Sequence, residues 1–192
     1  MPMSKDAETP VARYRDAART RESILRAGQK LFAEQGYPTT GIRDVAAAAS
    51  VNSALIQRYF GSKEGLLRAT LEDLLKVDAI TAGDRTQFGK RAVSILLAAG
   101  AVPNPVAIMA LAMSDASARK LCIDLLHHNV IIPMSEWLGG NDALARAARL
   151  NTIWTGFITA RYLLPVEPLN DDRIASTRQW LERVTQAIAD EN

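Results

Sequence analysis

The sequence predicts an all-α protein, with an N-terminal head of three helices and a larger helical body, about nine helices in all. Apolar residues make up 48% of the 192 residues, which is enough for a substantial core. In most segments they recur at the three- and four-residue spacing of one helix face. No segment shows the alternation of β-branched residues that favours a strand. Gly and Pro fall where one apolar pattern gives way to the next.

The N-terminal segment divides into an arm and a first helix. Residues 1–18 show no helical period and contain several cations, so we expect a flexible basic arm. From Thr20 to Gln35 the apolar residues share one helix face. These residues are Ile24, Leu25, Leu31 and Phe32. Gly36, followed by Pro38, suits the end of this helix.

Two very short helices follow. Thr40 can cap the first of them, and Asn52 can cap a second that runs to about Tyr59. A fourth helix is expected from Lys63 to about Ala82. Because helices of seven or eight residues are unstable alone in water, neighbouring helices must hold both short ones in place. Two such helices joined by a tight turn are typical of a helix-turn-helix, which presents its second helix to the major groove of DNA.

The outward face of the third helix suits contact with bases. Ser53 and Ala54 are small enough to let the backbone approach DNA. Gln57 can pair with adenine and Arg58 with guanine. The alternative is that Gln57 and Arg58 are ordinary solvated surface.

Other polar residues suit contact with phosphates. Helix N-termini attract anions, and those beside Thr39, Thr40 and Lys63 would lie near the same helix face. Arg43 and the Tyr59 hydroxyl are further candidates. The alternatives are that Tyr59 is a core aromatic residue with a solvated hydroxyl and that Lys63 is an ordinary lysine in a first helical turn.

The charge distribution agrees with a DNA-binding head. Residues 1–70 contain 11 Lys and Arg against 7 Asp and Glu, and residues 71–192 contain 12 against 14. The surplus of four and the deficit of two sum to the net charge of +2. A basic segment on a slightly acidic remainder favours a nucleic-acid partner, although a chance fluctuation of surface charge would look the same.

The remainder is also expected to be helical. The expected helices are 85–101, 105–113, 117–138 with an interruption or kink at Pro133, 142–164, and one from 171 or 172 to 189. The domain boundary is expected near residue 68. Residues 19–68 would form the helix-turn-helix domain and residues 69–192 the body.

The segment 20–68 resembles the TetR family of bacterial transcriptional repressors. The residues that carry the resemblance are Ala27, Leu31, Phe32, Gly36, Tyr37, Thr39, Thr40, Ile42, Val45, Ala46, Ala49, Val51, Asn52, Ile56, Tyr59, Phe60, Ser62, Lys63, Glu64 and Leu67. The resemblance implies an all-α homodimer that binds a palindromic operator. It places Thr40, Ser53, Ala54, Gln57, Tyr59 and Lys63 at the family's DNA-contacting positions.

Three residues depart from the family pattern. Ser50 stands between the two short helices, where the family usually has Gly, and a left-handed backbone there costs roughly 1 kcal/mol with a side chain. Ala54 replaces a frequent Gly, and Gln57 replaces a frequent aromatic residue. The operator sequence therefore does not follow from the resemblance.

The resemblance also implies that the body forms the dimer and binds a small-molecule effector. We expect the dimer interface on the helices at 142–164 and 171–189, with internal packing as the alternative for their apolar stripes. The candidate interface residues are Leu150, Ile153, Trp154, Phe157, Ile158, Trp180, Leu181, Val184 and Ile188.

A pocket for an apolar effector is expected among the helices between 85 and 138. The candidate lining residues are Met109, Met113, Leu125, Met134 and Trp137. Pliable methionines suit an irregular cavity, but they suit an ordinary core equally well. Binding of the effector is expected to pivot the fourth helix and so to release the operator.

Other classes of protein fit the sequence less well. We find no Ser/His/Asp grouping, carboxylate pair or Gly-rich phosphate loop, so we expect no enzyme and no cofactor. Adjacent His127 and His128 point about 100° apart on a helix, so we expect no metal site. The single Cys122, the lack of a secretory signal and the lack of a membrane span favour the cytoplasm. A helical adaptor that uses the head for protein contacts is the remaining alternative.

Overall fold

The computed structural model describes residues 10–98, 103–169 and 174–191, and within them all regular structure is helical, which confirms the all-α prediction. The α-helices are α1 (Pro10–Glu34), α2 (Ile42–Ala48), α3 (Ser53–Phe60), α4 (Lys63–Leu74), α5 (Asp78–Thr81), α6 (Phe88–Ala98), α7 (Pro105–Ala112), α8 (Ala116–Leu126), α9 (Ile132–Leu138), α10 (Ala143–Ile158) and α11 (Ile174–Asp190). Short 3₁₀ helices span Arg85–Gln87 and Glu167–Leu169, and π-helical turns span His127–Ile131 and Thr159–Leu163.

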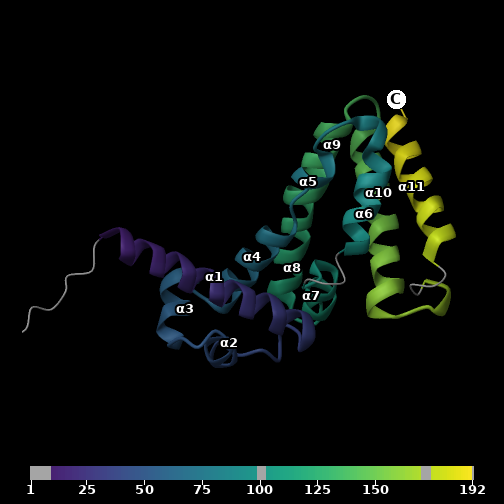
Figure 1. The fold of residues 1–192 in the computed structure, drawn as a ribbon. Coiled ribbons are helices and arrows are strands. Elements are labelled where there is room, and N and C mark those ends of the chain that lie inside the picture. Colours follow the sequence, from purple (N-terminus) through teal and green to yellow (C-terminus); the bar gives the residue numbers. More distant parts are fainter. Residues whose placement is uncertain (1–9, 99–102, 170–173, 192) are drawn as a thin grey trace, which may run out of the picture.

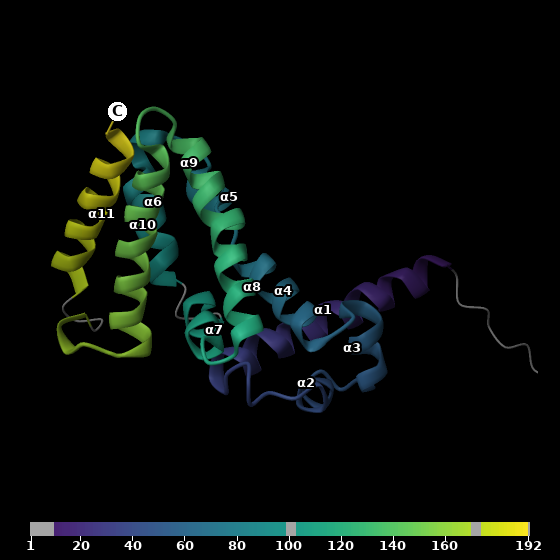
Figure 2. The same cartoon turned by 180° about the vertical axis from the view of Figure 1, so that it is seen from behind.

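The helices form an elongated molecule (Figure 1). The helices α1, α2 and α3 gather at one end, and α8 with α9 forms a long rod that rises away from them. On the other side of this rod α6, α10 and α11 lie beside one another, as the view from behind also shows (Figure 2). The C-terminus therefore lies far from the helix-turn-helix.

The buried apolar side chains form two cores. The first lies among α1, α2, α3 and α4 and extends to α7 and α8 through Ile108 and Leu121. The second lies among α5, α6, α9, α10 and α11. The expected division at residue 68 falls inside α4, and the packing of the head continues into helices much later in the chain.

The first helix is longer than predicted. It begins at Pro10, so the expectation of a non-helical arm is wrong over residues 10–18, and residues 1–9 lie outside the described residues. Proline suits a first helical turn because its φ is already helical and its missing N–H is not needed there. Ala and Arg, both strong helix formers, then supply much of the segment before Ile24, where the apolar period starts.

The predicted helix at 63–82 is divided in two. α4 ends at Leu74, and Leu75 leaves helical geometry with φ −90° and ψ 58°. Leu75 is buried in the first core, whereas Val77 is buried in the second. The break is thus the point at which the chain passes from one core to the other, and we call residues 74–77 the hinge.

The predicted interruption at Pro133 takes the form of a π-helical turn. The amide of Ile132 donates to the carbonyl of His127, five residues earlier. In a regular α-helix, Pro133 would lack its hydrogen bond and its ring would clash with the carbonyl of Asn129. The wider turn relieves this conflict, so α8 and α9 continue as one rod.

Candidate nucleic-acid interface and body cavity

The N-cap of α2 is Gly41, so the prediction that Thr40 caps this helix is wrong by one residue. The Gly41 amide donates to the Asp44 carboxylate at 2.7 Å. Thr40 is 1% exposed, and its hydroxyl donates to the carbonyl oxygen of Gly36 at 2.8 Å. Thr40 therefore closes the turn after α1, and its hydroxyl is turned away from solvent, whereas Thr39 is exposed.

The turn between α2 and α3 contains a left-handed residue, Ser50, with φ +55°. Hydrogen bonds on both sides hold this conformation. The amide of Val51 donates to the carbonyl of Ala46 at 2.9 Å, and the Ser23 hydroxyl on α1 donates to the carbonyl of Ala49 at 3.3 Å. The chain accepts a strain of roughly 1 kcal/mol at Ser50 to keep this turn.

The predicted base-contacting residues lie on the outer face of α3. Asn52 caps the helix as predicted, since its Oδ1 accepts the amide of Ala54 at 2.8 Å. Ile56 is fully buried and fixes the inner face to the head core. The side chains left exposed to solvent are Ser53, Ala54, Gln57 and Arg58.

A glycine fixes α3 against α4. A Cβ at Gly65 would lie 1.9 Å from the carbonyl oxygen of Phe60, so no other residue fits without moving the backbone. Ser62 caps α4, since its Oγ accepts the Gly65 amide at 2.9 Å. Sequence reasoning missed Gly65, although a glycine in a first helical turn, where it lowers helix propensity, was the available signal.

Lys63 lies between the head and the body. Its Nζ is 4.3 Å from the centroid of the Tyr37 ring and donates to the carbonyl of Pro38 at 3.4 Å. Burial lowers the pKa of Lys63, and the charge of Asp115 opposes that shift. Burial raises the pKa of the Tyr37 hydroxyl, with Asp115 contributing. Asp115 is the N-cap of α8, so a charge of the rod faces the start of α4.

The other predicted phosphate contacts are accessible. Arg43 on α2 is exposed, and Tyr59 on α3 is half-buried. A cation absent from the predicted set, Arg21 on α1, lies over the Phe60 ring at 5.2 Å from its centroid. Its guanidinium adds positive charge beside the C-terminal end of α3.

A cavity of about 360 Å³ lies where the two cores meet, and we call it the body cavity. Its walls come from the hinge, α5, α6, the N-terminal half of α7, the end of α8 with its π turn, and α10. The cavity thus touches the segment that joins the head to the body.

Of the residues predicted to bind the effector, only Met109 lines the body cavity. Met113 and Leu125 pack in the first core, and Met134 is buried in the second. Trp137 stacks on Phe88 with their ring centroids 4.5 Å apart. Two residues predicted for the dimer interface line the cavity instead, namely Trp154 and Ile158.

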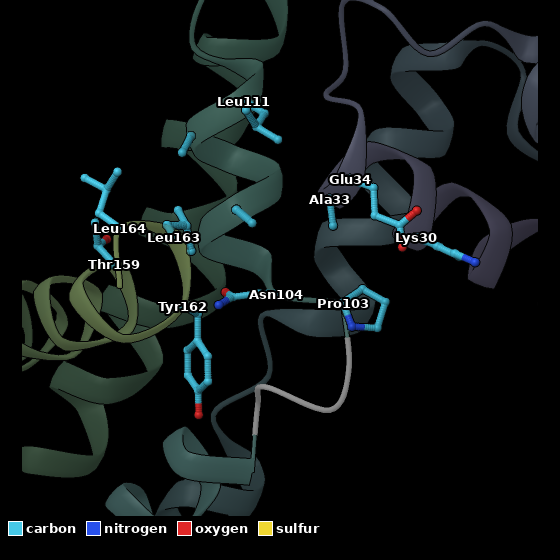
Figure 3. A pocket seen from close by; sticks show the side chains of 12 residues that line it. Lys30, Ala33, Glu34, Pro103, Asn104, Leu111, Thr159, Tyr162, Leu163 and Leu164 are labelled. Atoms are coloured by element: carbon cyan, nitrogen blue, oxygen red, sulfur yellow. The ribbon is translucent and has the colours of Figure 1, made fainter. Parts of the chain in front are cut away.

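A larger and more open groove of about 980 Å³ lies on the other side of α7. Figure 3 shows Lys30 and Glu34 of α1 on one side of it and Tyr162 of the second π turn on the other. Pro103 and Asn104 line both the groove and the body cavity. The helix α7 therefore separates the two spaces, and its N-terminus borders both.

Most of the predicted interface residues are buried within the single chain. Leu150, Trp154, Phe157, Ile158, Leu181 and Ile188 all belong to the second core. The indole N–H of Trp154 donates to the Thr185 hydroxyl at 3.2 Å. Ile153 and Val184 are half-buried, and Trp180 is 48% exposed. The structure thus shows internal packing for six of the nine predicted interface residues.

Reactive and metal-binding chemistry is not evident in the part of the chain that the structure describes. No group of three or more His, Cys, Asp or Glu side chains there could hold a metal ion. His128 Nδ1 lies 2.7 Å from the carbonyl oxygen of Asp124. Burial raises the pKa of the Cys122 thiol to about 11, which makes it unreactive. None of the described helices is both long and apolar enough to cross a membrane.

Comparison with protein families identifies both parts of the chain. Residues 24–70 match the model of bacterial regulatory proteins of the tetR family, and residues 86–188 match the tetracycline-repressor-like C-terminal domain. A TetR-family regulator from Streptomyces coelicolor has a similar structure, with a TM-score of 0.58 and 25% identity over 96% of this chain and 99% of its own.

The curated relatives match this chain over only part of its length. The transcriptional regulator HbdR of an Aromatoleum species is 47% identical over 55 residues, which are 29% of this chain and 24% of that protein. A helix-turn-helix transcriptional repressor of Mycobacterium tuberculosis is 41% identical over 73 residues, which are 38% and 37% of the two chains. The matched segment thus spans about a quarter to two fifths of these relatives.

Proposed function

Because this chain belongs to the TetR family of bacterial regulatory proteins, we propose that it represses transcription as a homodimer on a palindromic operator and leaves the operator when a small apolar effector binds its body. This is a family of regulators rather than of enzymes. In this proposal residues 19–68 are the DNA-binding domain, residues 69–192 bind the effector and form the dimer, and the protein acts in the cytoplasm.

The outer face of α3 is the single observation that carries the DNA-binding proposal. Four side chains suited to close approach and base pairing are exposed on a helix whose other face is fixed by Ile56. Gln57 and Arg58 would contact bases in the major groove. Phosphates would be bound by Lys63 and by the four flanking residues Thr39, Arg43, Tyr59 and Arg21. The buried hydroxyl of Thr40 would support the turn instead.

The outer faces of α10 and α11 support the proposed dimer. Ala145, Ala148 and Thr152 form an exposed row of small side chains on α10, where another helix could approach closely. Trp180 on α11 offers a large, half-exposed apolar surface, which a partner would cover. A two-fold dimer would place two copies of α3 on the two half-sites of a palindrome.

The position of the body cavity supports the proposed response to effector. Leu74, Leu75 and Val77 of the hinge line this cavity, so a bound molecule would contact the end of α4 directly. A movement of α4 would move α3 as well, because Gly65 packs directly against the Phe60 carbonyl and its amide is hydrogen-bonded to Ser62 in the turn between the two helices. A coupling free energy of about 1–3 kcal/mol would change operator affinity by five- to over a hundredfold.

A gel shift with the DNA upstream of the protein's own gene tests the proposal. We expect retention of a double-stranded fragment that contains a palindrome, with a steep loss of affinity as salt rises. The double variant Gln57→Ala/Arg58→Ala should abolish specific binding. Gln87→Ala/Lys90→Ala, an exposed pair on the body, should not.

The adaptor alternative makes a different prediction. Salt-insensitive binding to a protein partner, together with no retention of any fragment from the genomic neighbourhood at low ionic strength, would contradict the repressor proposal. Adding metabolite extract covers the case in which a small molecule promotes DNA binding.

A further inference from the structure

Asn104 uses one side-chain atom and leaves the other without a partner. Its Oδ1 caps α7 by accepting the amide of Val106 at 2.9 Å. Its Nδ2 makes no hydrogen bond, although the residue is only 9% exposed. A buried donor without an acceptor costs about 1–3 kcal/mol, so an unfilled donor at a cavity points to a ligand that fills it.

The Nδ2 atom itself has almost no accessible surface, so a ligand oxygen reaches it only after a small movement of the wall around Asn104. Asn104 lines both the body cavity and the open groove on the other side of α7. Figure 3 shows its amide group on the side of Tyr162 rather than on the side of Lys30. The Tyr162 hydroxyl does not fill the gap, because it donates to the carbonyl of Leu97 at 2.8 Å.

The other polar groups of the body cavity are few, and the strongest donors are already engaged. The Lys76 ammonium pairs with Asp73 at 2.7 Å, and the Trp154 indole donates to Thr185. Asn151 and Thr155 complete the polar lining. Among the described residues that line this cavity, none is acidic. A positively charged ligand would therefore lose its hydration without gaining a counter-ion.

We propose that the effector is an apolar molecule without positive charge that carries a carbonyl-type oxygen, and that this oxygen accepts a hydrogen bond from Asn104 Nδ2. The inference rests on the proposed function, in which the body cavity is the effector site. At about 360 Å³ the cavity lies near the lower end of the usual range of roughly 300–1,000 Å³ for small-molecule sites, so the effector is small.

Three probes of nearly equal shape test the proposal on the full-length protein. Acetophenone has a carbonyl oxygen, α-methylstyrene has a CH₂ group in its place, and 1-phenylethylamine has a positive charge. Dissociation constants are measured by ligand-observed NMR at millimolar concentrations. We expect the ketone to bind about five- to thirtyfold more tightly than the alkene, and the amine to bind most weakly.

A matched pair of variants assigns the preference to Asn104. Asn104→Asp keeps the helix cap, since Asp caps as well as Asn, but it replaces the donor with an acceptor. Asn151→Asp makes the same change at another position of the same cavity. We expect the preference for the ketone to vanish in Asn104→Asp and to persist in Asn151→Asp.

Several results would overturn the proposal. These are equal affinities of ketone and alkene for the wild-type protein, no binding of any probe, or a preference that survives in Asn104→Asp. The wild-type comparison stands even if a variant does not fold. If the ketone is preferred but leaves operator binding unchanged in the gel shift, the Asn104 contact holds and the effector role of the cavity fails.

Discussion

The head and the body are both helical, but their geometry is fixed in different ways. In the head, each turn is closed by a specific local interaction, as at Gly41 with Asp44, at Asn52, and at Gly65 against Phe60. In the body, two helices pass through wide π turns, and open spaces flank both sides of α7. The surface that meets the DNA duplex is thus held by contacts between residues that are close together in the sequence. The body, which would bind a small molecule, retains open spaces between its helices.

The largest expected effect tests the close contact between α3 and α4 in the head. Gly65→Ala places a Cβ against the Phe60 carbonyl oxygen, and because backbone must move we expect a loss of about 3 kcal/mol or more in the free energy of unfolding. Urea denaturation measures this loss. The control is Gly28→Ala in α1, whose Cβ would meet side-chain atoms of Leu66 and no backbone atom, the nearest at 3.2 Å. It should stay within about 1 kcal/mol of wild type, and equal losses in the two variants would contradict the argument.

The next effect separates two roles within the head. Gln57→Ala should change the relative affinity for operators that differ at one base pair by about 1–3 kcal/mol. Lys63→Ala should weaken binding to all sequences alike and lower the slope of affinity against salt by about 1. Competition gel shifts over a salt series measure both. A uniform loss in Gln57→Ala would remove Gln57 from the base-contacting set.

A smaller effect is expected at Ser50, where the head contains a strained backbone conformation. Ser50 holds φ +55°, so Ser50→Gly should raise the free energy of unfolding by about 0.5–1 kcal/mol through relief of strain. Ser53→Gly, in the first turn of α3, serves as the control and should lower it. Thermal denaturation of both variants gives the sign, and destabilisation by Ser50→Gly would mean that the Ser50 side chain stabilises the turn.

The smallest effect concerns the hinge between the two regions. Asp73 accepts hydrogen bonds from Lys76 at 2.7 Å and from Gln29 at 2.9 Å, and the first of these is the main cause of its lowered pKa. A carboxyl with a lowered pKa in the folded state stabilises the protein above its ordinary pKa, and this contribution is lost as the pH falls through the folded-state value.

For this partly exposed group the contribution should be below about 1 kcal/mol. Asp73→Asn should therefore flatten the fall in stability that occurs below about pH 4, as measured by urea denaturation at several pH values. The exposed neighbouring change Glu72→Gln provides the control. An unaltered acid limb in Asp73→Asn would show that the hinge draws no stability from this carboxylate.

The same contrast explains what the sequence could predict. The Asn52 cap was predictable because a cap depends on residues two or three positions away. The cap of α2 is predicted one position too early because two adjacent residues both suit a cap, and the hydrogen bond from the Gly41 amide to the Asp44 carboxylate selects Gly41. The helix start at Pro10 was missed because the apolar period, which depends on burial, begins only where α1 meets the core.

Contacts in the body were less predictable. An apolar stripe shows that a helix face is covered but not what covers it. The sequence therefore leaves Leu150 and Leu181 open between a dimer interface and internal packing, and the chain's own core buries both. Met109 and Met113 lie one helical turn apart on or beside α7, yet only Met109 faces the cavity. Which side of α7 borders empty space depends on the packing of helices far apart in the sequence.

The sharing of α7 and α8 with the first core has a consequence for engineering. Ile108 and Leu121 complete that core, so a fragment that stops after α4 would expose apolar surface that these helices normally cover. Chimeras that exchange operator specificity between related regulators should therefore transplant matched α7 and α8 surfaces together with the N-terminal segment, rather than cut the chain once between the two.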